Sequence, residues 1–452
     1  MIEVDFASDA ERRPRCACRV CAATGASHSL DVQGDAGTLS LFLCADCGSY
    51  YFDGEAPVSG YEGGLADGFW LDYVQGGAGL ISMFSPLLAL DPVPEGSLID
   101  VGCGFGFVVD YWTRHHGPAI GLEKSAYGAI GAQSLGADIR PQYLDDYRQS
   151  DPDSRHAIVY SSEVIEHVPD PGAFLDELVT MLDARSLLIL TTPAATAIRP
   201  DVDRAELIAA LSPHFHYAIL SEKILRRMLE ERGLQVHIEI HGVQMVAWAS
   251  RAPLPKIRYG RFDWPVYLDH LDQLAETDEP HLAIGALYRL FKDAMNSGHP
   301  EIAGRAWDRL LPRVRAVYGI DLLAPELSGL MQITTPLAQL DRYPSWLGLG
   351  LLFGALHVGH QSNDRRLKLR MLDAALAVLR RRAEVDLQFG QEARHCLPFA
   401  ERQYLIALSE ALTLGIQPQQ SEGMPEDLRA SLSILVRELV DRLPTDAGRD
   451  GE

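Results

Sequence analysis

Two glutamates and a histidine in one short segment, Glu163, Glu166 and His167, are the side chains best suited to acid–base chemistry. If a helix begins at Glu163, offsets of three and four residues place all three side chains on one face. A second histidine, His216, lies in the segment 213–217, just before a predicted helix at 221–232. Because an imidazole titrates near neutral pH, a histidine at this place could remove a proton from a hydroxyl substrate.

These side chains need a scaffold, and the segment 98–107 supplies its first part. Apolar residues and Asp100 are typical of the end of a buried strand, and helical spacing begins at Phe107. The glycines between them therefore form a strand-to-helix turn at which backbone approaches a ligand. The next apolar strand ends at Glu123, 17 positions after Gly106, where a carboxylate can bind both hydroxyls of a ribose. The alternating glycines are Gly102, Gly104 and Gly106.

The Asp-x-Gly-x-Gly-x-Gly form, with no fourth glycine at dinucleotide spacing, resembles class I S-adenosylmethionine-dependent methyltransferases. The likeness covers about residues 60–250. It implies an α/β fold with a Rossmann-like seven-stranded sheet, S-adenosylmethionine as cofactor, and methyl transfer as the reaction. The further segments that carry it, in family order, are 157–160, 161–171, 174–178, 186–190 and 191–193.

The resemblance also implies which residues contact the cofactor. Leu144 would supply an apolar face to the adenine ring and Asp145 an acceptor for its amine, although an exposed acidic loop without a role is the alternative. Tyr73 and Gln75 lie in an aromatic helical stretch that would fold over the methionine end, unless these side chains only pack onto the sheet. The residues expected to bind the cofactor are Asp100, Gly102, Gly104, Gly106, Glu123, Leu144, Asp145, Ser161 and Tyr73.

The Glu-x-x-Glu-His pattern with a distant histidine also resembles the metal set of the methyltransferases of ubiquinone biosynthesis and of small-RNA 3′ ends. Carried over, the catalytic divalent metal would be held by Glu163, Glu166, His167 and His216, and it would lower the pKa of the acceptor's hydroxyls. The same pattern occurs in methyltransferases not known to need metal. Metal assistance, a histidine general base and a structural role therefore remain as alternatives.

Cysteines crowd the N-terminal part of the chain, where five of the seven lie within residues 16–47. Two Cys-x-x-Cys knuckles separated by 22 residues are typical of a zinc ribbon, and the intervening 37–43 is strand-like. A site closed by four thiolates would be structural, with Cys16 as a substitute ligand for Cys18. Incidental thiols or a disulfide are the alternative. The predicted zinc ligands are Cys18, Cys21, Cys44 and Cys47.

Charge and hydropathy exclude several classes of protein. The 452 residues include 40 basic and 62 acidic side chains, a net charge of −22, which disfavours nucleic acid as a partner. Residues 1–5 lack the pattern of a secretion signal. The longest apolar run, 346–358, is too short to cross a bilayer and is typical of a core helix. We therefore expect a cytoplasmic protein without a membrane span.

The C-terminal third is predicted to be all-helical, with spacing of three and four residues at 282–296, 301–317, 367–382 and 392–414. A helix pair resembles the tetratricopeptide type, but a clean 34-residue period is missing. Basic residues at 365–382 form either a solvated face or a dock for an anionic substrate or a protein partner. The expected domains are a zinc ribbon (1–50), a methyltransferase domain with an N-terminal cap segment (51–255), a helical domain (256–443) and a disordered tail (444–452).

The ribbon joined to a catalytic domain resembles bacterial sugar and natural-product methyltransferases. The expected acceptor is therefore a hydroxyl of a sugar, a glycan or another small molecule. The helical domain departs from the deoxysugar C-methyltransferases, which carry a different C-terminal domain. An RNA methyltransferase and a non-catalytic scaffold that binds S-adenosylmethionine are the alternatives.

Overall fold

The computed structural model divides the chain into two compact units, Met1–Ala283 and Ile284–Glu452. The predicted boundaries at 50, 255 and 443 differ from this division and stay predictions about independent folding. The predicted tail at 444–452 lies outside the described residues. The structure describes residues 2–6, 12–34, 37–53, 68–76, 80–258, 260, 262–327, 329–362, 364–388 and 396–413.

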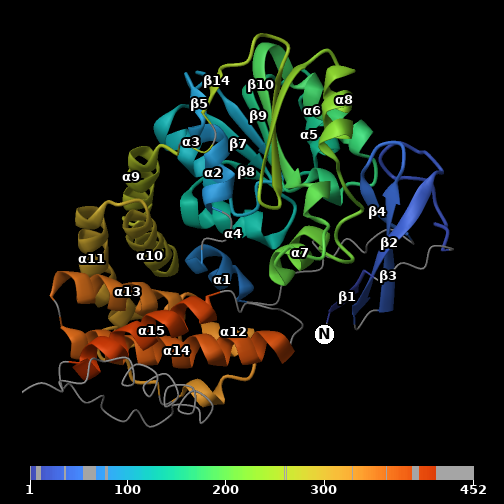
Figure 1. Ribbon diagram of the computed structural model, residues 1–452. Helices are drawn as coiled ribbons and strands as arrows, with labels where there is room; N and C mark the ends of the chain where they lie inside the picture. The colour runs from blue at the N-terminus through green and yellow to red at the C-terminus, as the bar shows by residue number, and fades with distance from the viewer. Residues whose placement is uncertain are drawn as a thin grey trace, which may run out of the picture. The chain divides into compact units, whose positions relative to one another are not determined.

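A seven-stranded sheet is the centre of the first unit, with the strand order β12-β13-β10-β9-β6-β7-β8 (Figure 1). The five strands from β10 to β8 are parallel, and β13 runs antiparallel to both of its neighbours. Helices cover both faces of the sheet (Figure 1), which explains why β6 is buried along its whole length. The α/β class and the Rossmann-like sheet are thereby confirmed. The strands are β6 (Leu98–Val101), β7 (Ala119–Leu122), β8 (Ile139–Arg140), β9 (His156–Ser162), β10 (Leu182–Pro193), β12 (Gln235–His241) and β13 (Gln244–Ser250).

Helices join these strands, and local sequence signals mark where several of them begin. Asp170 caps α6 by accepting a hydrogen bond from the Ala173 amide at 3.0 Å, and Pro171 follows at the first helical position. Asp203 caps α7 in the same way, and Ser221 caps α8. The helices are α1 (Phe69–Gly76), α2 (Leu80–Leu88), α3 (Phe107–His115), α4 (Ala126–Leu135), α5 (Leu144–Ser150), α6 (Pro171–Thr180), α7 (Arg204–Leu211), α8 (Glu222–Glu230) and α9 (Trp264–Leu274).

The strand order places a topological switch between β6 and β9. From β6 the chain proceeds outward through β7 and β8, and it returns to the other side of β6 at β9 and β10. In open parallel sheets, ligands bind outside the carboxyl ends of the strands at such a point. The glycine turn follows β6 and the Glu163 segment follows β9, so both lie at this switch.

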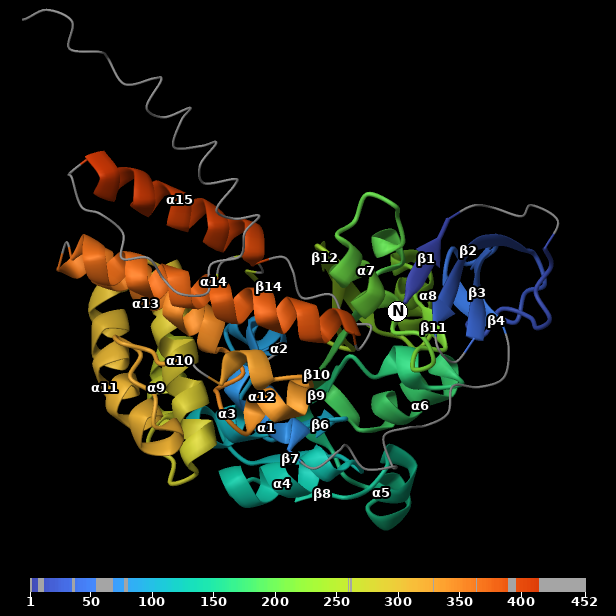
Figure 2. The ribbon, with the colours of Figure 1, turned by 90° about the horizontal axis from the view of Figure 1, so that it is seen from below.

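A second sheet, β1-β2-β3-β4-β11, contains the N-terminal strands. The predicted strand at 37–43 is β3, and the pairing is antiparallel throughout. The last strand, β11, follows α7 in the chain and lies beside β4 (Figure 2). The N-terminal sheet is therefore completed by a segment of the catalytic part. The strands are β1 (Glu3–Asp5), β2 (Ala26–Gly34), β3 (Gly37–Cys44), β4 (Tyr50–Asp53) and β11 (Ala218–Ile219); a separate pair joins β5 (Leu90–Asp91) to β14 (Lys256–Ile257).

The second unit is helical in its described residues, as predicted. Its apolar run forms the buried α13, and no helix among the described residues is long and apolar enough to span a membrane. Three arginines of the basic stretch bond within the unit: Arg380 to Glu401, Arg381 to the Ile333 carbonyl and Arg382 to Asp386. The helices are α10 (Pro280–Asn296), which crosses from the first unit, α11 (Pro300–Tyr318), α12 (Pro336–Leu340), α13 (Leu347–Gln361), α14 (Arg365–Gln388) and α15 (Leu397–Thr413).

A buried histidine, His270, joins α9 to α3 inside the first unit. Its Nδ1 lies 3.2 Å from His115 Nε2, and its Nε2 lies 3.9 Å from the Asp110 carboxylate. Arg114 bonds the same carboxylate at 2.8 Å. Burial lowers the pKa of His270 from 6.5 to about 3, so its imidazole is neutral in the folded protein near neutral pH.

The substitution His270→Gln should weaken the acid sensitivity of the fold. Below pH 6.5 this histidine binds a proton in the unfolded chain but not in the folded chain. The free energy of unfolding therefore falls as the pH decreases toward 3. This group alone removes about 1.3 kcal/mol of unfolding free energy between pH 7 and pH 5.5, and the variant should lose that much less. Urea titrations at both pH values, with the exposed His360→Gln as control, measure the difference. Equal losses in all three proteins would contradict the assignment.

Candidate active site

The glycine turn has the backbone geometry that its sequence requires. Gly102, Gly104 and Gly106 have φ angles of 78°, 55° and 88°, a region that disfavours residues with a side chain. A Cβ atom on Gly102 would lie 2.4 Å from Val164 Cγ2. One on Gly106 would lie 2.4 Å from Ile139 Cδ1. The turn thus needs glycine both for its conformation and for the closeness of its neighbours.

Two carboxylates flank this turn, and they differ in their partners. Glu123, just after β7, accepts hydrogen bonds from the amides of Gly104 at 3.0 Å and Ser125 at 2.8 Å. Asp100 is buried in β6, and its Oδ1 has no hydrogen-bond partner among the described residues. Burial, and then the charge of Glu123, raises the pKa of Asp100. A buried oxygen without a partner is suited to accept a hydrogen bond from a bound ligand.

Helix α1 places Tyr73 beside the turn. The Tyr73 ring stacks on Phe107 with centroids 5.9 Å apart, and its hydroxyl lies 3.4 Å from the place of a Cβ on Gly104. Gln75, the other residue expected here, is buried and its Nε2 lies 3.0 Å from His281 Nδ1. The structure therefore brings Tyr73 to the turn and joins Gln75 to the beginning of α10.

The remaining residues expected at the cofactor occupy different environments. Leu144 is buried at the first position of α5, whereas Asp145 beside it is exposed. Ser161 is buried near the end of β9, and its hydroxyl donates to the Val101 carbonyl at 3.0 Å. The Ser161 proton therefore links two neighbouring strands.

The segment after β9 differs from the prediction. No helix begins at Glu163, whose φ of 56° is left-handed, and only a single 3₁₀ turn, η1 (Ile165–His167), follows. The helical face proposed for Glu163, Glu166 and His167 is therefore wrong. The tight turn nevertheless brings ligand atoms of Glu166, His167 and His216 within 4.8 Å of one another.

The two glutamates are held by side chains that the sequence did not single out for a role. Glu163 Oε1 accepts from Thr191 Oγ1 at 2.8 Å and from Gln244 Nε2 at 3.1 Å. Glu166 Oε2 accepts from Thr192 Oγ1 at 2.9 Å. Both threonines lie near the carboxyl end of the parallel strand β10, a position that the sequence indicates, whereas Gln244 is the first residue of β13 and no sequence pattern marks it.

The second oxygen of Glu166, Oε1, is buried without a hydrogen-bond partner among the described residues and lies 4.0 Å from His216 Nε2. Burial, and then the charge of Glu163, raises the pKa of Glu166. Burial of its carboxyl raises the pKa of Glu163 too. Because the Glu163 side chain reaches solvent, we expect its pKa to be raised less than the pKa of Glu166.

In both histidines of the cluster, a backbone carbonyl holds the same ring nitrogen, Nδ1. The Nδ1 atoms of His167 and His216 lie 3.1 and 2.9 Å from the carbonyl oxygens of Phe215 and Ala210. Since a carbonyl only accepts, each Nδ1 carries the proton and each neutral ring has its lone pair on Nε2. Burial lowers the pKa of both rings, that of His216 to about 3. Histidines that ligate metals are oriented by this kind of backbone bond.

The loop before β11, which contains His216, has a strained backbone. Ser212 and His214 have positive φ angles of 33° and 70°, which are unusual for residues with side chains. The Tyr217 amide then donates to the Glu166 carbonyl at 2.8 Å. Phe215 lies in the same loop and is 42% exposed, which is high for a large apolar residue beside a buried polar cluster. No sequence pattern marks Phe215 as a site residue.

The predicted cysteine ligands lie together in the ribbon, with their four sulfur atoms within 4.8 Å of one another. Cys18 and Cys47 have sulfurs 3.7 Å apart, and Cys21 and Cys44 have sulfurs 3.6 Å apart. Tetrahedral zinc with bonds of about 2.3 Å places its sulfurs about 3.8 Å apart. Cys16 is not part of this set.

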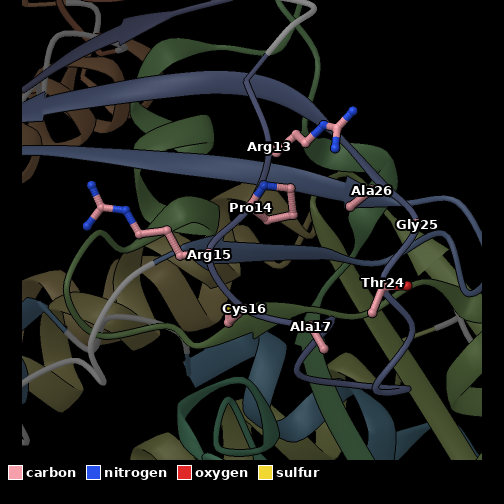
Figure 3. A pocket seen from close by; sticks show the side chains of 8 residues that line it. All are labelled: Arg13, Pro14, Arg15, Cys16, Ala17, Thr24, Gly25 and Ala26. Atoms are coloured by element: carbon pink, nitrogen blue, oxygen red, sulfur yellow. The ribbon is translucent and has the colours of Figure 1, made fainter.

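A surface cavity of about 420 Å³ also lies on the ribbon (Figure 3). Arg13 and Arg15 at its margin extend in different directions (Figure 3), so they do not converge on one ligand. The candidate catalytic and cofactor residues are absent from its lining. The lining residues are Arg13, Pro14, Arg15, Cys16, Ala17, Thr24, Gly25 and Ala26.

Comparison with known proteins agrees with this geometry. Residues 79–238 match a family model described as a methyltransferase domain. A ubiquinone biosynthesis O-methyltransferase of Xanthomonas campestris pv. campestris (strain B100) is 30% identical over 193 residues, which are 37% of this chain and 79% of the relative. The chain belongs to the class I S-adenosylmethionine-dependent methyltransferases. Residues 79–238 are its methyltransferase domain.

Other relatives match over a shorter range. An enzyme of the same name from Rhodopseudomonas palustris (strain BisA53) is 38% identical over 100 residues, 21% of this methyltransferase and 39% of the relative's length. Among solved structures, the plantazolicin methyltransferase BpumL with bound SAH is 14% identical, with 40% of this chain and 82% of that chain covered at a TM-score of 0.31.

The substitution Gly102→Ala should weaken cofactor binding in this methyltransferase. Gly233 is a matched control, because its φ of 76° is close to the 78° of Gly102, while no atom of the described residues lies within 4 Å of its added Cβ. Both variants suffer left-handed strain of about 1–2 kcal/mol. Only Gly102→Ala also meets Val164, and we expect its Kd for S-adenosylhomocysteine to rise at least about tenfold, or 1.4 kcal/mol. Calorimetry that gives both variants the same Kd would refute this reading of the turn.

Proposed function

We propose that this enzyme transfers the methyl group of S-adenosylmethionine to a hydroxyl oxygen of a small molecule, with Glu166, His167 and His216 as ligands of a divalent cation. The neutral, backbone-bonded histidines beside the partnerless Glu166 oxygen are the observation that carries the proposal. The names of the relatives, ubiquinone biosynthesis O-methyltransferases, support oxygen as the methylated atom. The acceptor class, a sugar, glycan or other metabolite hydroxyl, follows the sequence-based expectation.

The donor side is proposed to lie at the carboxyl end of β6. Glu123, already oriented by two amides, accepts from the ribose hydroxyls, and the Asp100 oxygen without a partner accepts from the ammonium group of the methionine portion. Tyr73 closes the turn against water. Leu144 and Asp145 remain the proposed contacts of the adenine. Because the donor carries the reactive group, these residues mainly orient it for in-line displacement.

On the acceptor side, the surroundings favour metal ligation over general-base catalysis. The 4.0 Å between Glu166 Oε1 and His216 Nε2 is less than twice a metal–ligand bond of about 2.1 Å, so one ion can bind both atoms. A bound divalent cation would lower the pKa of the acceptor hydroxyl. His216, whose pKa burial lowers to about 3, is a weak proton acceptor near neutral pH. Glu163 lies beside this set and is proposed to receive the hydroxyl's proton.

We also propose that the four ribbon cysteines hold a structural zinc ion. The sulfur separations of 3.6 and 3.7 Å fit tetrahedral thiolate coordination. A site with four protein ligands leaves no position for a substrate, so its role is structural.

The acceptor class can be tested with purified enzyme, labelled S-adenosylmethionine and a cell extract separated into small-molecule, glycan, protein and RNA fractions. We expect base-stable label, as in a methyl ether, in the small-molecule or glycan fraction. Label in RNA would instead support the RNA methyltransferase. Cofactor binding without labelling of any fraction would support the scaffold and contradict the proposal.

Removal of divalent cations should stop turnover without loss of the donor. We expect Glu166→Gln and His216→Gln to lower kcat at least about 100-fold, while the Kd for S-adenosylhomocysteine stays within about twofold. Electron paramagnetic resonance should detect bound Mn²⁺ in the wild type and weaker binding in both variants. Full activity of the metal-depleted enzyme, with its ribbon zinc verified by elemental analysis, would favour the histidine base.

Phe215 should contribute to acceptor affinity, because it offers an exposed apolar ring, its carbonyl bonds to His167 and it directly precedes His216 in the chain. We expect Phe215→Ala to raise KM for the labelled acceptor about tenfold, or 1.4 kcal/mol, with little change in cofactor affinity. Phe399→Ala removes an equally exposed ring, 46% against 42%, from the second unit and serves as control. An unchanged KM would exclude Phe215 from the acceptor site.

A further inference from the structure

We infer that the N-terminal ribbon is a positioning element for His216, and that Ser221 is the residue through which the second cysteine knuckle acts. The inference rests on the proposed function, since it concerns the position of a proposed ligand. It assigns to the ribbon a role inside its own chain, in the geometry of the catalytic cluster.

Ser221 contacts the knuckle with both its side chain and its backbone. Its hydroxyl donates to the Cys47 carbonyl at 2.5 Å, and its amide donates to Ser49 Oγ at 3.0 Å. Two residues later, Lys223 Nζ donates to the Asp46 carbonyl at 3.3 Å. The same Ser221 oxygen caps α8 by accepting from the Ile224 amide at 3.3 Å. The turn that presents two cysteines to a metal is therefore bonded to the beginning of α8.

Strand pairing continues this attachment toward His216. Ala218 and Ile219 of β11 pair with Tyr51 and Tyr50 of β4, and the Phe52 amide donates to the Tyr217 carbonyl at 3.3 Å. Apolar packing follows the same path, because one core contains ribbon and catalytic side chains together. Its members include Cys18, Phe42, Cys44, Cys47 and Tyr51 with Leu220, Ile224 and Leu225.

The opposite side of the segment 215–221 contacts the catalytic cluster. The Tyr217 amide donates to the Glu166 carbonyl at 2.8 Å, and His167 donates to the Phe215 carbonyl. Ribbon contacts therefore begin at Tyr217, one residue after His216. The residues on both sides of His216, Phe215 and Tyr217, bond to the catalytic cluster. Because hydrogen-bonded strands transmit small displacements, release of the knuckle should free His216 while leaving the separately supported glycine turn unaffected.

The glycine turn is held by other residues than the segment that contains His216. Its amides at Gly102 and Cys103 donate to the Leu122 carbonyl, and its glycines pack on Val164 and Ile139. These neighbours belong to the seven-stranded sheet and the segment after β9. Cofactor binding should therefore survive changes in the ribbon that disturb His216.

Hydrogen exchange of the 452-residue chain, followed by mass spectrometry, tests the inference without an activity assay. We expect Ser221→Ala to raise exchange of peptides covering 215–221 about tenfold, with unchanged zinc content and unchanged exchange at 98–107. Thr335→Ala is the matched control, because it also removes a helix cap, the 3.0 Å bond to the Ala338 amide, but in the second unit. Exchange at 215–221 that stays at the wild-type rate would overturn the inference.

Zinc removal and Ser49→Ala supply second measurements if Ser221→Ala folds poorly. Both should raise exchange at 215–221 and weaken Mn²⁺ binding about tenfold, while calorimetry gives a Kd for S-adenosylhomocysteine within about twofold of the wild type. Faster exchange confined to the ribbon, 26–53, would contradict the positioning role. If the wild type binds no Mn²⁺, the proposed metal site fails, and the exchange at 215–221 still decides whether the ribbon positions this segment.

Discussion

The close approach of Gly102 to Val164 is the constraint on which the arrangement of the two half-sites depends. A Cβ atom on this glycine would lie 2.4 Å from a valine methyl group, so the segments that follow the paired strands β6 and β9 approach this closely only because residue 102 has no side chain. The strand order reverses at this place, and the chain leaves both strands on the same edge of the sheet. The donor turn and the Glu166 cluster therefore become neighbours through backbone geometry, before any catalytic side chain is considered.

Buried carboxylates on both sides of this junction would suit the cationic ligands that we propose. Asp100 Oδ1 and Glu166 Oε1 are each buried without a hydrogen-bond partner among the described residues, and burial is the main cause of their raised pKa values. Such groups cost stability unless a hydrogen-bond donor or a cation satisfies them. A donor that carries ammonium and sulfonium charges, and a divalent cation between Glu166 and the histidines, would each satisfy one of these oxygens. The two orphaned oxygens thus lie on the two half-sites that the proposed reaction requires.

The sequence was sufficient for features that depend on local pattern. The glycine turn, Glu123 after its strand, the cysteine knuckles and the C-terminal helices all follow from spacing and composition. Features that depend on nonlocal pairing were missed. The left-handed Glu163 replaced a predicted helix because Thr191 and Gln244, from two other strands, hold its carboxylate. Likewise, no pattern in residues 218–219 indicates that they complete a sheet begun in the N-terminal ribbon.

Backbone strain gives an independent reason to treat the ribbon and the catalytic cluster as the functional parts of the first unit. In the described parts of the chain, the non-glycine residues with positive φ are Ala22, Glu163, Ser212 and His214. Ala22 closes the first cysteine knuckle, where its amide donates to the Cys18 carbonyl at 2.8 Å, and the other three surround Glu166 and His216. Each such conformation costs about 1–3 kcal/mol and persists only where surrounding contacts impose it. Because the strain gathers at the proposed ligand sets, selection for ligand geometry explains it better than selection for stability.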